Sequence, residues 1–199
     1  MSNLVEREFP AKALMIGLRS MGYSFSTAVA DIIDNCISAE ANRIDIYSDP
    51  LAAVPYFCVL DNGHGMNRKQ LDNAMLPGSN REDVPDSEIE LGRFGLGLKS
   101  ASLSQCREFI VASKAFGKIN CMAFDLDVIE EKNKLFLKEL SPEETDALPH
   151  IEDLKQYNSG TLVIWNKFDS INDSSEKFED SFRALVRESK IHTELTFHR

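Results

Sequence analysis

The stretch that decides the fold is Ala30-Asp31-Ile32-Ile33-Asp34-Asn35, inside a helix-favouring run from Ser26 to Ala41. A spacing of four places Asp31 and Asn35 on one helix face. A carboxylate can act as a general base and an amide oxygen can bind a divalent cation, so this pair suits metal-assisted phosphate hydrolysis. Asp34 lies about 100° around the helix from Asn35 and is a weaker candidate. The meaning of the pair depends on three motifs that follow it.

The composition limits the classes of partner. The chain has 199 residues, a formal net charge of −10 and a pI near 4.9. Because neutralising phosphates requires clustered Lys and Arg, we expect no direct nucleic-acid binding by this acidic segment. No apolar run approaches the length of a membrane span, so we expect no membrane partner. Four widely spaced cysteines without a C-x-x-C pair indicate buried, reduced thiols. With no export signal, we expect a cytoplasmic location, or a nuclear one in a eukaryote.

The apolar periodicity predicts an α+β fold. Predicted helices cover Ala11–Met21, Ser26–Ala41, Arg68–Met75, Gly95–Leu103 and Ser175–Glu188. Predicted strands cover Arg43–Tyr47, Tyr56–Leu60, Glu108–Lys114, Ile119–Asp125, Leu135–Leu140 and Thr161–Trp165. Ser26 or Thr27 is expected to cap the second helix, and aromatic residues including Phe109, Phe116, Phe124 and Trp165 are expected in the sheet core. This order predicts a two-layer sandwich of helices on a mixed, mostly antiparallel sheet.

The second motif is Asp61-Asn62-Gly63-His64-Gly65-Met66, directly after a strand. A carboxylate there can accept a hydrogen bond from an exocyclic amine, and Gly63 and Gly65 let a flat ring approach the backbone. The alternative is a turn in which Asp61 bonds only its own backbone, and the motif alone favours that alternative.

The third motif is the glycine-rich run Gly92-Arg93-Phe94-Gly95-Leu96-Gly97-Leu98-Lys99-Ser100, which opens a helix. Amide groups at a helix N-terminus bind anions, and Lys99 adds a cation. The run is neither a Walker A loop, because Leu98 separates Gly97 from Lys99, nor a Rossmann fingerprint, because Ser100 replaces the third glycine. A flexible hinge before an amphipathic helix is the alternative. The fourth motif, Ser159-Gly160-Thr161 before a strand, carries little weight alone.

Together the four motifs resemble the GHKL superfamily of gyrase, heat-shock chaperone, histidine kinase and mismatch-repair ATPases. Within the superfamily, the chain is most similar to the microrchidia-type and related Hsp90-like domains. Two segments carry this similarity: Leu18-Arg19-Ser20-Met21-Gly22-Tyr23 and Gly97-Leu98-Lys99-Ser100-Ala101-Ser102. The resemblance spans about Ala13 to Trp165 and implies the Bergerat ATP-binding fold. It also implies ATP and Mg²⁺ as ligands.

The resemblance also implies roles for individual residues. Asn35 would bind the magnesium that bridges the triphosphate. Asp61 would recognise the adenine amino group, with Gly65 and Thr161 joining through ordered water. Met66 would pack on the base, beside Gly63. The predicted nucleotide contacts at the end of the lid are Gly92, Phe94, Gly95, Leu96, Gly97, Leu98 and Lys99, where the glycine amides would hold the terminal phosphates.

For domain organisation, the resemblance implies an ATP-binding domain over residues 1–170, with a lid at residues 77–97. The polar, turn-rich run Pro77–Leu91 is the expected mobile part of that lid. Residues 171–199 form a helical segment, and the apolar pattern stops at Arg199 as though the chain continued into a connector. In the superfamily, lid closure drives dimerisation, so we expect an ATP-dependent homodimer of the longer protein.

Asp31 departs from the superfamily pattern, which commonly has a water-activating glutamate at this position. Aspartate is one methylene shorter, and a displacement of about 1 Å can cost on the order of a hundredfold in rate. The sequence therefore predicts a slow ATPase with Asp31 as its base. An ATP-binding switch with little hydrolysis is the alternative. A histidine-kinase-type catalytic domain is less favoured, because that class lacks an acid at this position.

Overall fold

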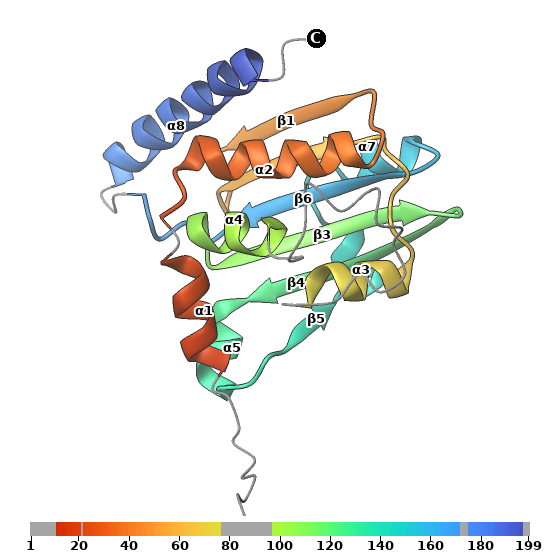
Figure 1. Ribbon diagram of the computed structural model, residues 1–199, viewed down its shortest axis with the longest axis horizontal. Coiled ribbons are helices and arrows are strands. Elements are labelled where there is room, and N and C mark those ends of the chain that lie inside the picture. Colours follow the sequence, from red (N-terminus) through yellow and green to blue (C-terminus); the bar gives the residue numbers. More distant parts are fainter. Residues whose placement is uncertain (1–10, 21, 77–96, 172–174, 197–199) are drawn as a thin grey trace, which may run out of the picture.

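Figure 1 shows a twisted sheet with most of the helices packed on one face. The computed structural model describes residues 11–20, 22–76, 97–171 and 175–196. The helices are α1 (Ala11–Arg19), α2 (Phe25–Ser38), α3 (Arg68–Met75), α4 (Gly97–Gln105), α5 (Leu126–Lys132), α6 (Pro142–Asp146), α7 (Ile151–Gln156) and α8 (Ser175–Thr196). The strands are β1 (Ile44–Asp49), β2 (Tyr56–Asp61), β3 (Glu108–Ala115), β4 (Lys118–Asp125), β5 (Leu137–Glu139) and β6 (Gly160–Asn166). The α+β prediction is confirmed.

The six strands lie in the order β1-β2-β6-β3-β4-β5, and every pairing among the described strands is antiparallel. The last strand in the sequence, β6, therefore lies between β2 and β3. This arrangement sets Asp61 opposite Thr161, and Thr161 opposite Ser113, in neighbouring strands. A single row across the middle of the sheet thus carries three polar side chains.

The two faces of the sheet bury different cores, because successive side chains of a strand point to opposite faces. The larger core lies under α1, α2, α3, α4, α5 and α8, and includes Phe57, Val111 and Trp165 from the strands. The smaller core includes Leu60 and Ile110 and is covered by α7. Strand alternation places Asp61, Thr161 and Ser113 on the same face as the larger core. The polar row therefore lies beneath the helical layer.

The helix α2 starts one residue earlier than the sequence predicts. Ser24 is its N-cap, with a side-chain oxygen that accepts a hydrogen bond from the Thr27 amide at 3.1 Å, so the expected cap at Ser26 or Thr27 is wrong. The reason is Phe25, which is buried edge-on against Phe57 and Trp165 in the core. Burying that ring draws the first helical turn toward the sheet.

Other elements confirm or correct the sequence prediction. All four cysteines are free and buried, as expected. Phe116 is not a core residue: it is 89% exposed at the two-residue turn between β3 and β4, where it and Gly117 both have positive φ. A type I′ hairpin turn requires that backbone, and it points the ring away from the sheet. The helices α5, α6 and α7 were not predicted. The predicted loop Pro77–Leu91 lies outside the described residues.

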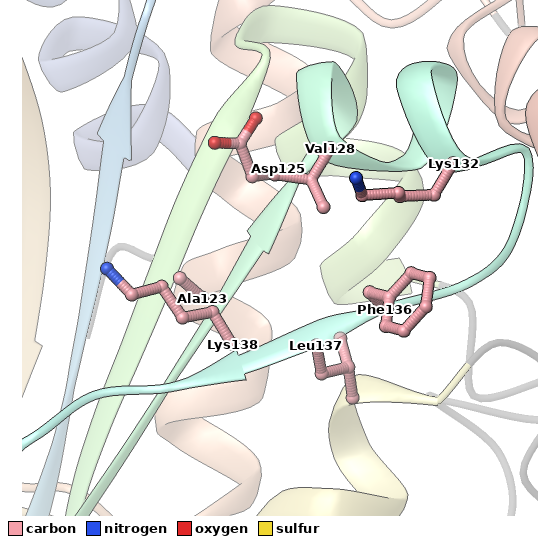
Figure 2. A pocket seen from close by; sticks show the side chains of 7 residues that line it. All are labelled: Ala123, Asp125, Val128, Lys132, Phe136, Leu137 and Lys138. Atoms are coloured by element: carbon pink, nitrogen blue, oxygen red, sulfur yellow. The ribbon is translucent and has the colours of Figure 1, made fainter.

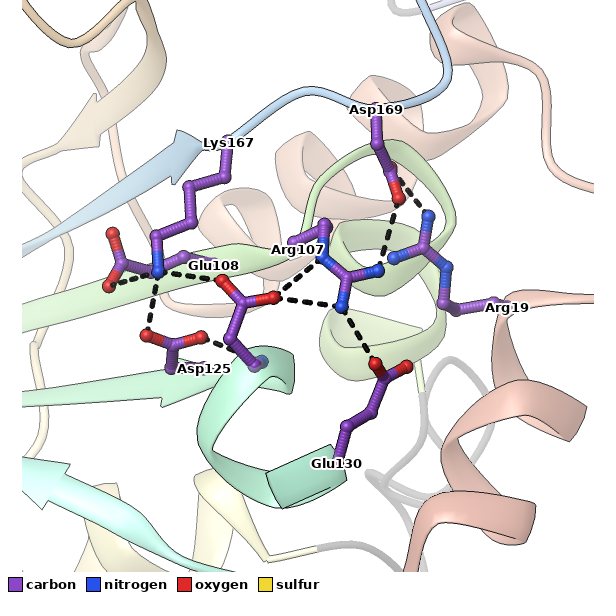
Figure 3. A network of polar contacts seen from close by, with 8 residues as sticks. Arg19, Arg107, Glu108, Asp125, Glu130, Lys167 and Asp169 are labelled. Atoms are coloured by element: carbon purple, nitrogen blue, oxygen red, sulfur yellow. Dashed lines mark hydrogen bonds and ion pairs between the residues drawn. The ribbon is translucent and has the colours of Figure 1, made fainter.

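A network of ion pairs joins α1, α5 and the segments next to β3 and β6 (Figure 3). Arg107, in the turn between α4 and β3, contacts Asp127 at 2.8 Å, Glu130 at 3.0 Å and Asp169 at 3.4 Å. Arg19 at the end of α1 contacts the same Asp169 at 2.6 Å. The remaining members, joined through Lys167, are Glu108 and Asp125. These contacts tie α1, α5 and the exit of β6 together.

None of the helices in the described residues is both long enough and apolar enough to cross a membrane.

Candidate functional site

The centre of the candidate site is Asp61, the last residue of β2. Its side chain is buried, with 3% of the residue exposed, and one carboxylate oxygen accepts a hydrogen bond from the Gly63 amide at 2.8 Å. Burial raises the pKa of Asp61 above its usual 3.8, against the opposing effects of the Gly63 amide, the Cys36 thiol and the Thr161 amide. The backbone-bonded turn that the sequence offered as the plain alternative is therefore present. A carboxylate has about four lone-pair positions, so Asp61 can accept a ligand hydrogen bond in addition to those from Gly63, Cys36 and Thr161.

The turn after Asp61 is closely packed on two sides. A Cβ atom at Gly63 would lie 2.5 Å from the Ala39 carbonyl oxygen at the end of α2. Gly65 has φ +65°, and a Cβ there would lie 2.0 Å from the Lys114 carbonyl oxygen of β3. L-residues with a side chain rarely adopt that φ, and backbone atoms fill the space that a Cβ would need. Glycine is therefore the residue type that fits at position 65. The turn is thus held between α2 and β3.

The polar row continues from Asp61 to Thr161 and then to Ser113. The Ser113 hydroxyl oxygen lies 2.9 Å from the Thr161 hydroxyl and accepts a hydrogen bond from the Met66 amide at 2.8 Å. Both hydroxyl residues are buried, and Met66 packs against the larger core. The structure therefore brings Asp61, Gly65, Met66 and Thr161 together as predicted. Ser113 was missed by the sequence analysis, where it looks like one more residue of an apolar strand.

Asp31 and Asn35 lie one turn apart on α2, as predicted. The Asn35 side-chain NH₂ donates to the Asp31 main-chain carbonyl at 2.8 Å. Among the described residues, none donates a hydrogen bond to the oxygen of the exposed Asn35 amide, so this oxygen can accept another partner. An amide oxygen is a hard ligand of the kind that Mg²⁺ binds, and Mg²⁺ commonly takes its other ligands from water and substrate phosphates. The Asn35 side chain therefore fits the predicted metal role.

The α2 helix reaches the Asp61 turn through its C-terminal half. The His64 amide donates to the Ala39 carbonyl at 2.9 Å, and the thiol of Cys36, the residue after Asn35, interacts with Asp61. Burial and the Asp61 charge raise the pKa of Cys36 well above 9.0. The amide of Asn35 and the carboxylate of Asp61 thus belong to one continuous region.

Tyr23 and Asp34 interact with Asp31. Burial raises the pKa of Tyr23, whose hydroxyl interacts with the side chains of Ser100 and Asp31. Burial also raises the pKa of Asp34, and the nearby charge of Asp31 adds to that shift. Tyr23 and Ser100 lie in the two segments that carry the family resemblance. The Tyr23 hydroxyl therefore links the Asp31 side chain to Ser100 of α4.

The third motif is described in part. Gly97, Leu98 and Lys99 form the first turn of α4, whereas Gly92, Phe94, Gly95 and Leu96 lie outside the described residues. The Lys99 side chain is buried, with 1% of the residue exposed, and its ammonium donates to the Ala74 carbonyl in α3 at 2.7 Å. Lys99 therefore joins α3 and α4 at the two ends of the predicted lid segment. Its predicted phosphate contact stays a prediction.

A separate pocket lies between α5 and β5 (Figure 2). It has a volume of about 160 Å³ and is lined by Ala123, Asp125, Val128, Lys132, Phe136, Leu137 and Lys138. Its walls are mainly aliphatic and aromatic, and none of the predicted site residues contributes to it. We therefore treat it as distinct from the candidate site.

Comparison with known proteins identifies the family. The family model described as "Histidine kinase-, DNA gyrase B-, and HSP90-like ATPase" matches residues 23–161, a span that includes Asp31, Asn35, Asp61 and Thr161. The chain belongs to this ATPase family. The predicted superfamily resemblance is confirmed, and membership supports ATP binding by this domain.

Curated relatives of this ATPase-family domain include the microrchidia proteins. Over 170 residues, or 84% of this chain, it is 32% identical to mouse "ATPase MORC2B" and 28% identical to human "ATPase MORC2". It is 24% identical over 170 residues to "ATPase morc-1" of Caenorhabditis elegans. The matched region is 15%, 14% and 20% of those three relatives, respectively. The chain therefore spans a small part of their length.

Proposed function

We propose that this domain binds ATP with Mg²⁺ and hydrolyses it slowly to ADP and phosphate. The observation that carries the proposal is the buried Asp61 carboxylate, set in one row with Thr161 and next to the end of α2 that bears Asn35. Family membership supports the nucleotide, and the chemistry of these side chains supports the division of roles.

The proposed base-binding end is the Asp61 turn. The Asp61 carboxylate accepts a hydrogen bond from the adenine amino group, and Thr161 contributes through a bridging water. Because Gly65 packs closely on β3, the turn after Asp61 lies near the sheet. A flat ring can then lie along the backbone of this turn, with Met66 against the ring. Recognition at this end depends on groups that the sheet already holds in place.

The proposed reacting end is the exposed edge of α2 and the N-terminus of α4. Asn35 would hold the metal ion through its amide oxygen, and Mg²⁺ held there would neutralise charge on the triphosphate. Asp31 accepts the proton from the attacking water, while the Tyr23 hydroxyl, which also interacts with Ser100, holds the carboxylate. Amides of the predicted lid end, including that of Gly97, bind the terminal phosphates.

A second candidate function is an ATP-binding switch with little turnover. The observation that favours it is Asp31 itself, because its short side chain extends less far from α2 than a glutamate would. In both cases, closure of the segment at residues 77–97 over the nucleotide would promote dimerisation of the longer protein. Light scattering of the chain with and without a non-hydrolysable ATP analogue tests that step, and a monomer in both samples contradicts it for this domain.

Isothermal titration calorimetry combined with phosphate release separates the two functions. We expect ADP and ATP to bind in the presence of Mg²⁺, and phosphate to appear in a single-turnover reaction. Binding without phosphate release identifies the switch. Failure of both nucleotides to bind with Mg²⁺ contradicts both functions for this domain.

A further inference from the structure

The buried hydroxyl of Ser113 has a role that the family resemblance does not assign. Ser113 stands opposite Thr161 in the β3–β6 pair, and Thr161 stands opposite Asp61 in the β2–β6 pair. Ser113 has no exposed surface. It therefore cannot touch a nucleotide, and any effect on binding must pass through its neighbours.

Three neighbours use the full hydrogen-bonding capacity of the Ser113 hydroxyl. Its oxygen lies 2.8 Å from the Met66 amide nitrogen, 3.1 Å from the Gly160 carbonyl oxygen and 2.9 Å from the Thr161 hydroxyl oxygen. A hydroxyl donates one hydrogen bond and accepts two. The Met66 amide can only donate and the Gly160 carbonyl can only accept. The one arrangement that satisfies all three contacts sends the Ser113 proton to Gly160, so Thr161 must donate to Ser113.

This arrangement fixes the direction of the Thr161 hydroxyl. With its proton committed to Ser113, Thr161 presents only lone pairs to the site, beside a carboxylate that also only accepts. Such a pair suits a ligand edge that donates, such as the exocyclic amine of adenine or a water bonded to it. It disfavours the carbonyl oxygen that guanine carries at the equivalent ring position, because acceptors would then face acceptors.

The same hydroxyl also anchors the backbone beneath the base. The Met66 amide donates to Ser113, and the preceding Gly65 lies against the Lys114 carbonyl of the same strand. These contacts set how far the turn stands above β3. A base lying on that turn would therefore be positioned by Ser113 from below.

We propose that Ser113 is a positioning residue for adenine selection, acting through the Thr161 hydroxyl and the Met66 backbone. This inference rests on the proposed function, since it concerns the base-binding end of the same site. It predicts that removing a hydroxyl that no nucleotide can touch weakens discrimination between adenine and guanine nucleotides.

The test compares ADP and GDP binding by calorimetry, with competition for the weaker ligand, in the full chain. For Ser113→Ala we expect ADP affinity to fall roughly three- to tenfold, the effect of one lost hydrogen bond. GDP affinity should stay unchanged or rise, because the freed Thr161 hydroxyl can turn to donate. Ser113→Thr keeps the hydroxyl and should retain the ADP preference.

Ser102→Ala is the matched control, because Ser102 is also fully buried and accepts a hydrogen bond, from the Trp165 indole at 2.8 Å. It should lower the melting temperature without changing the ADP-to-GDP ratio. If Ser113→Ala does not fold, Thr161→Val provides the readout: it should reduce the same ratio, and Ser113→Thr should not.

Two results overturn the inference. The first is an unchanged ADP-to-GDP ratio in folded Ser113→Ala, including an equal loss for both nucleotides. The second is an unchanged ratio in Thr161→Val. Failure of the unmodified chain to bind ADP would instead contradict the proposed function, so the two failures are distinguishable.

Discussion

The two ends of the candidate site are built in different ways. At the base-binding end, Asp61, Thr161 and Ser113 are buried in neighbouring strands, and each hydrogen-bonds to backbone or to another of the three. At the reacting end, Asp31 is half-buried and Asn35 is exposed on a single helix. The first end is determined by strand register and the second by helix spacing. Changes at the first should therefore disturb binding or folding, whereas changes at the second should alter the rate and leave the fold intact.

The largest effect is expected for Asp31→Asn. This variant tests whether hydrolysis at the reacting end can be lost while nucleotide binding is kept. Removing a general base typically lowers the rate about 10²- to 10⁴-fold. We expect a loss of this size in single-turnover ATP hydrolysis, with ADP affinity unchanged within about twofold. Unchanged hydrolysis would exclude Asp31 as the base.

Two variants sharpen that result. Asp34→Asn is the control, because Asp34 lies about 100° around the helix from Asn35 and should affect hydrolysis less than tenfold. Asp31→Glu lengthens the side chain to that of the common superfamily residue. If reach limits the rate, this variant should hydrolyse ATP faster than the unmodified chain.

The next largest effect is expected for Gly65→Ala, paired with Gly97→Ala. A methyl group at Gly65 meets the Lys114 carbonyl at 2.0 Å on a backbone with φ +65°, whereas a Cβ at Gly97 meets nothing within 4 Å. Strain and overpacking should lower the free energy of unfolding by about 2–5 kcal/mol for Gly65→Ala. Urea denaturation should show a change below about 0.5 kcal/mol for Gly97→Ala. Equal losses would contradict the contrast between the two ends.

Candidate residues at both ends of the site can be found from the sequence, but fewer of the contributing residues can be found at the base-binding end. The spacing of Asp31 and Asn35 needs only the helical period, which the apolar residues around them reveal. Asp61 and Gly65 are visible because a carboxylate and glycines follow a strand. Ser113 is invisible in this way, since its role arises from the pairing of β3 with β6, 48 positions from Thr161. Strand order is a non-local property that single-strand patterns do not encode.

The errors in the predicted elements have similar causes. The cap of α2 was displaced because burial of Phe25 outweighs the local preference of Ser26 and Thr27 for capping. Phe116 was assigned to the core because aromatic composition does not reveal a two-residue turn with positive φ. In both cases tertiary packing or turn geometry determined what the local pattern left open.

Asp61→Asn tests the base-binding end without removing its bulk. A hydrogen bond to a charged group contributes about 1.5–3 kcal/mol, so ADP affinity should fall roughly ten- to hundredfold. Because burial raises the pKa of this acid, its ionised form disfavours folding, and the cost grows as pH rises through the folded-state pKa. The free energy of unfolding of the variant at neutral pH should therefore not fall.

The pH dependence of the unmodified chain follows from the same shift. As pH decreases, Asp61 is protonated at a pH above the usual 3.8, and ADP affinity should decrease over that interval. Asp61→Asn should lack this decrease. An ADP affinity that is independent of pH down to 4 in the unmodified chain would contradict Asp61 as the acceptor of the adenine amine.

The smallest effect is expected away from both ends, at Arg107→Ala. Partial burial tends to lower the pKa of Arg107, but hydrogen bonds to Asp127 and Glu130 outweigh it and raise the pKa. The carboxylates reach solvent, so we expect the free energy of unfolding to fall by only about 1 kcal/mol. Arg183→Ala, which breaks an exposed pair with Glu179 on α8, should change it by less than 0.5 kcal/mol, about the value of one helix pair. ADP affinity should be unchanged in both variants.

The sign of the pH effect separates the Arg107 network from Asp61. Hydrogen bonds from Lys167 and Arg107 lower the pKa of Asp127 below 3.8, so its contribution to stability is present above that pH and is lost as pH falls through the folded-state pKa. The stability difference between Arg107→Ala and the unmodified chain should therefore shrink in acid and at high salt. A buried acid such as Asp61, whose pKa is raised, gives the opposite dependence. Denaturation curves of the two variants from pH 3 to 7 should thus diverge in opposite directions, and parallel curves would contradict the assignment of burial to Asp61 and ion pairing to Asp127.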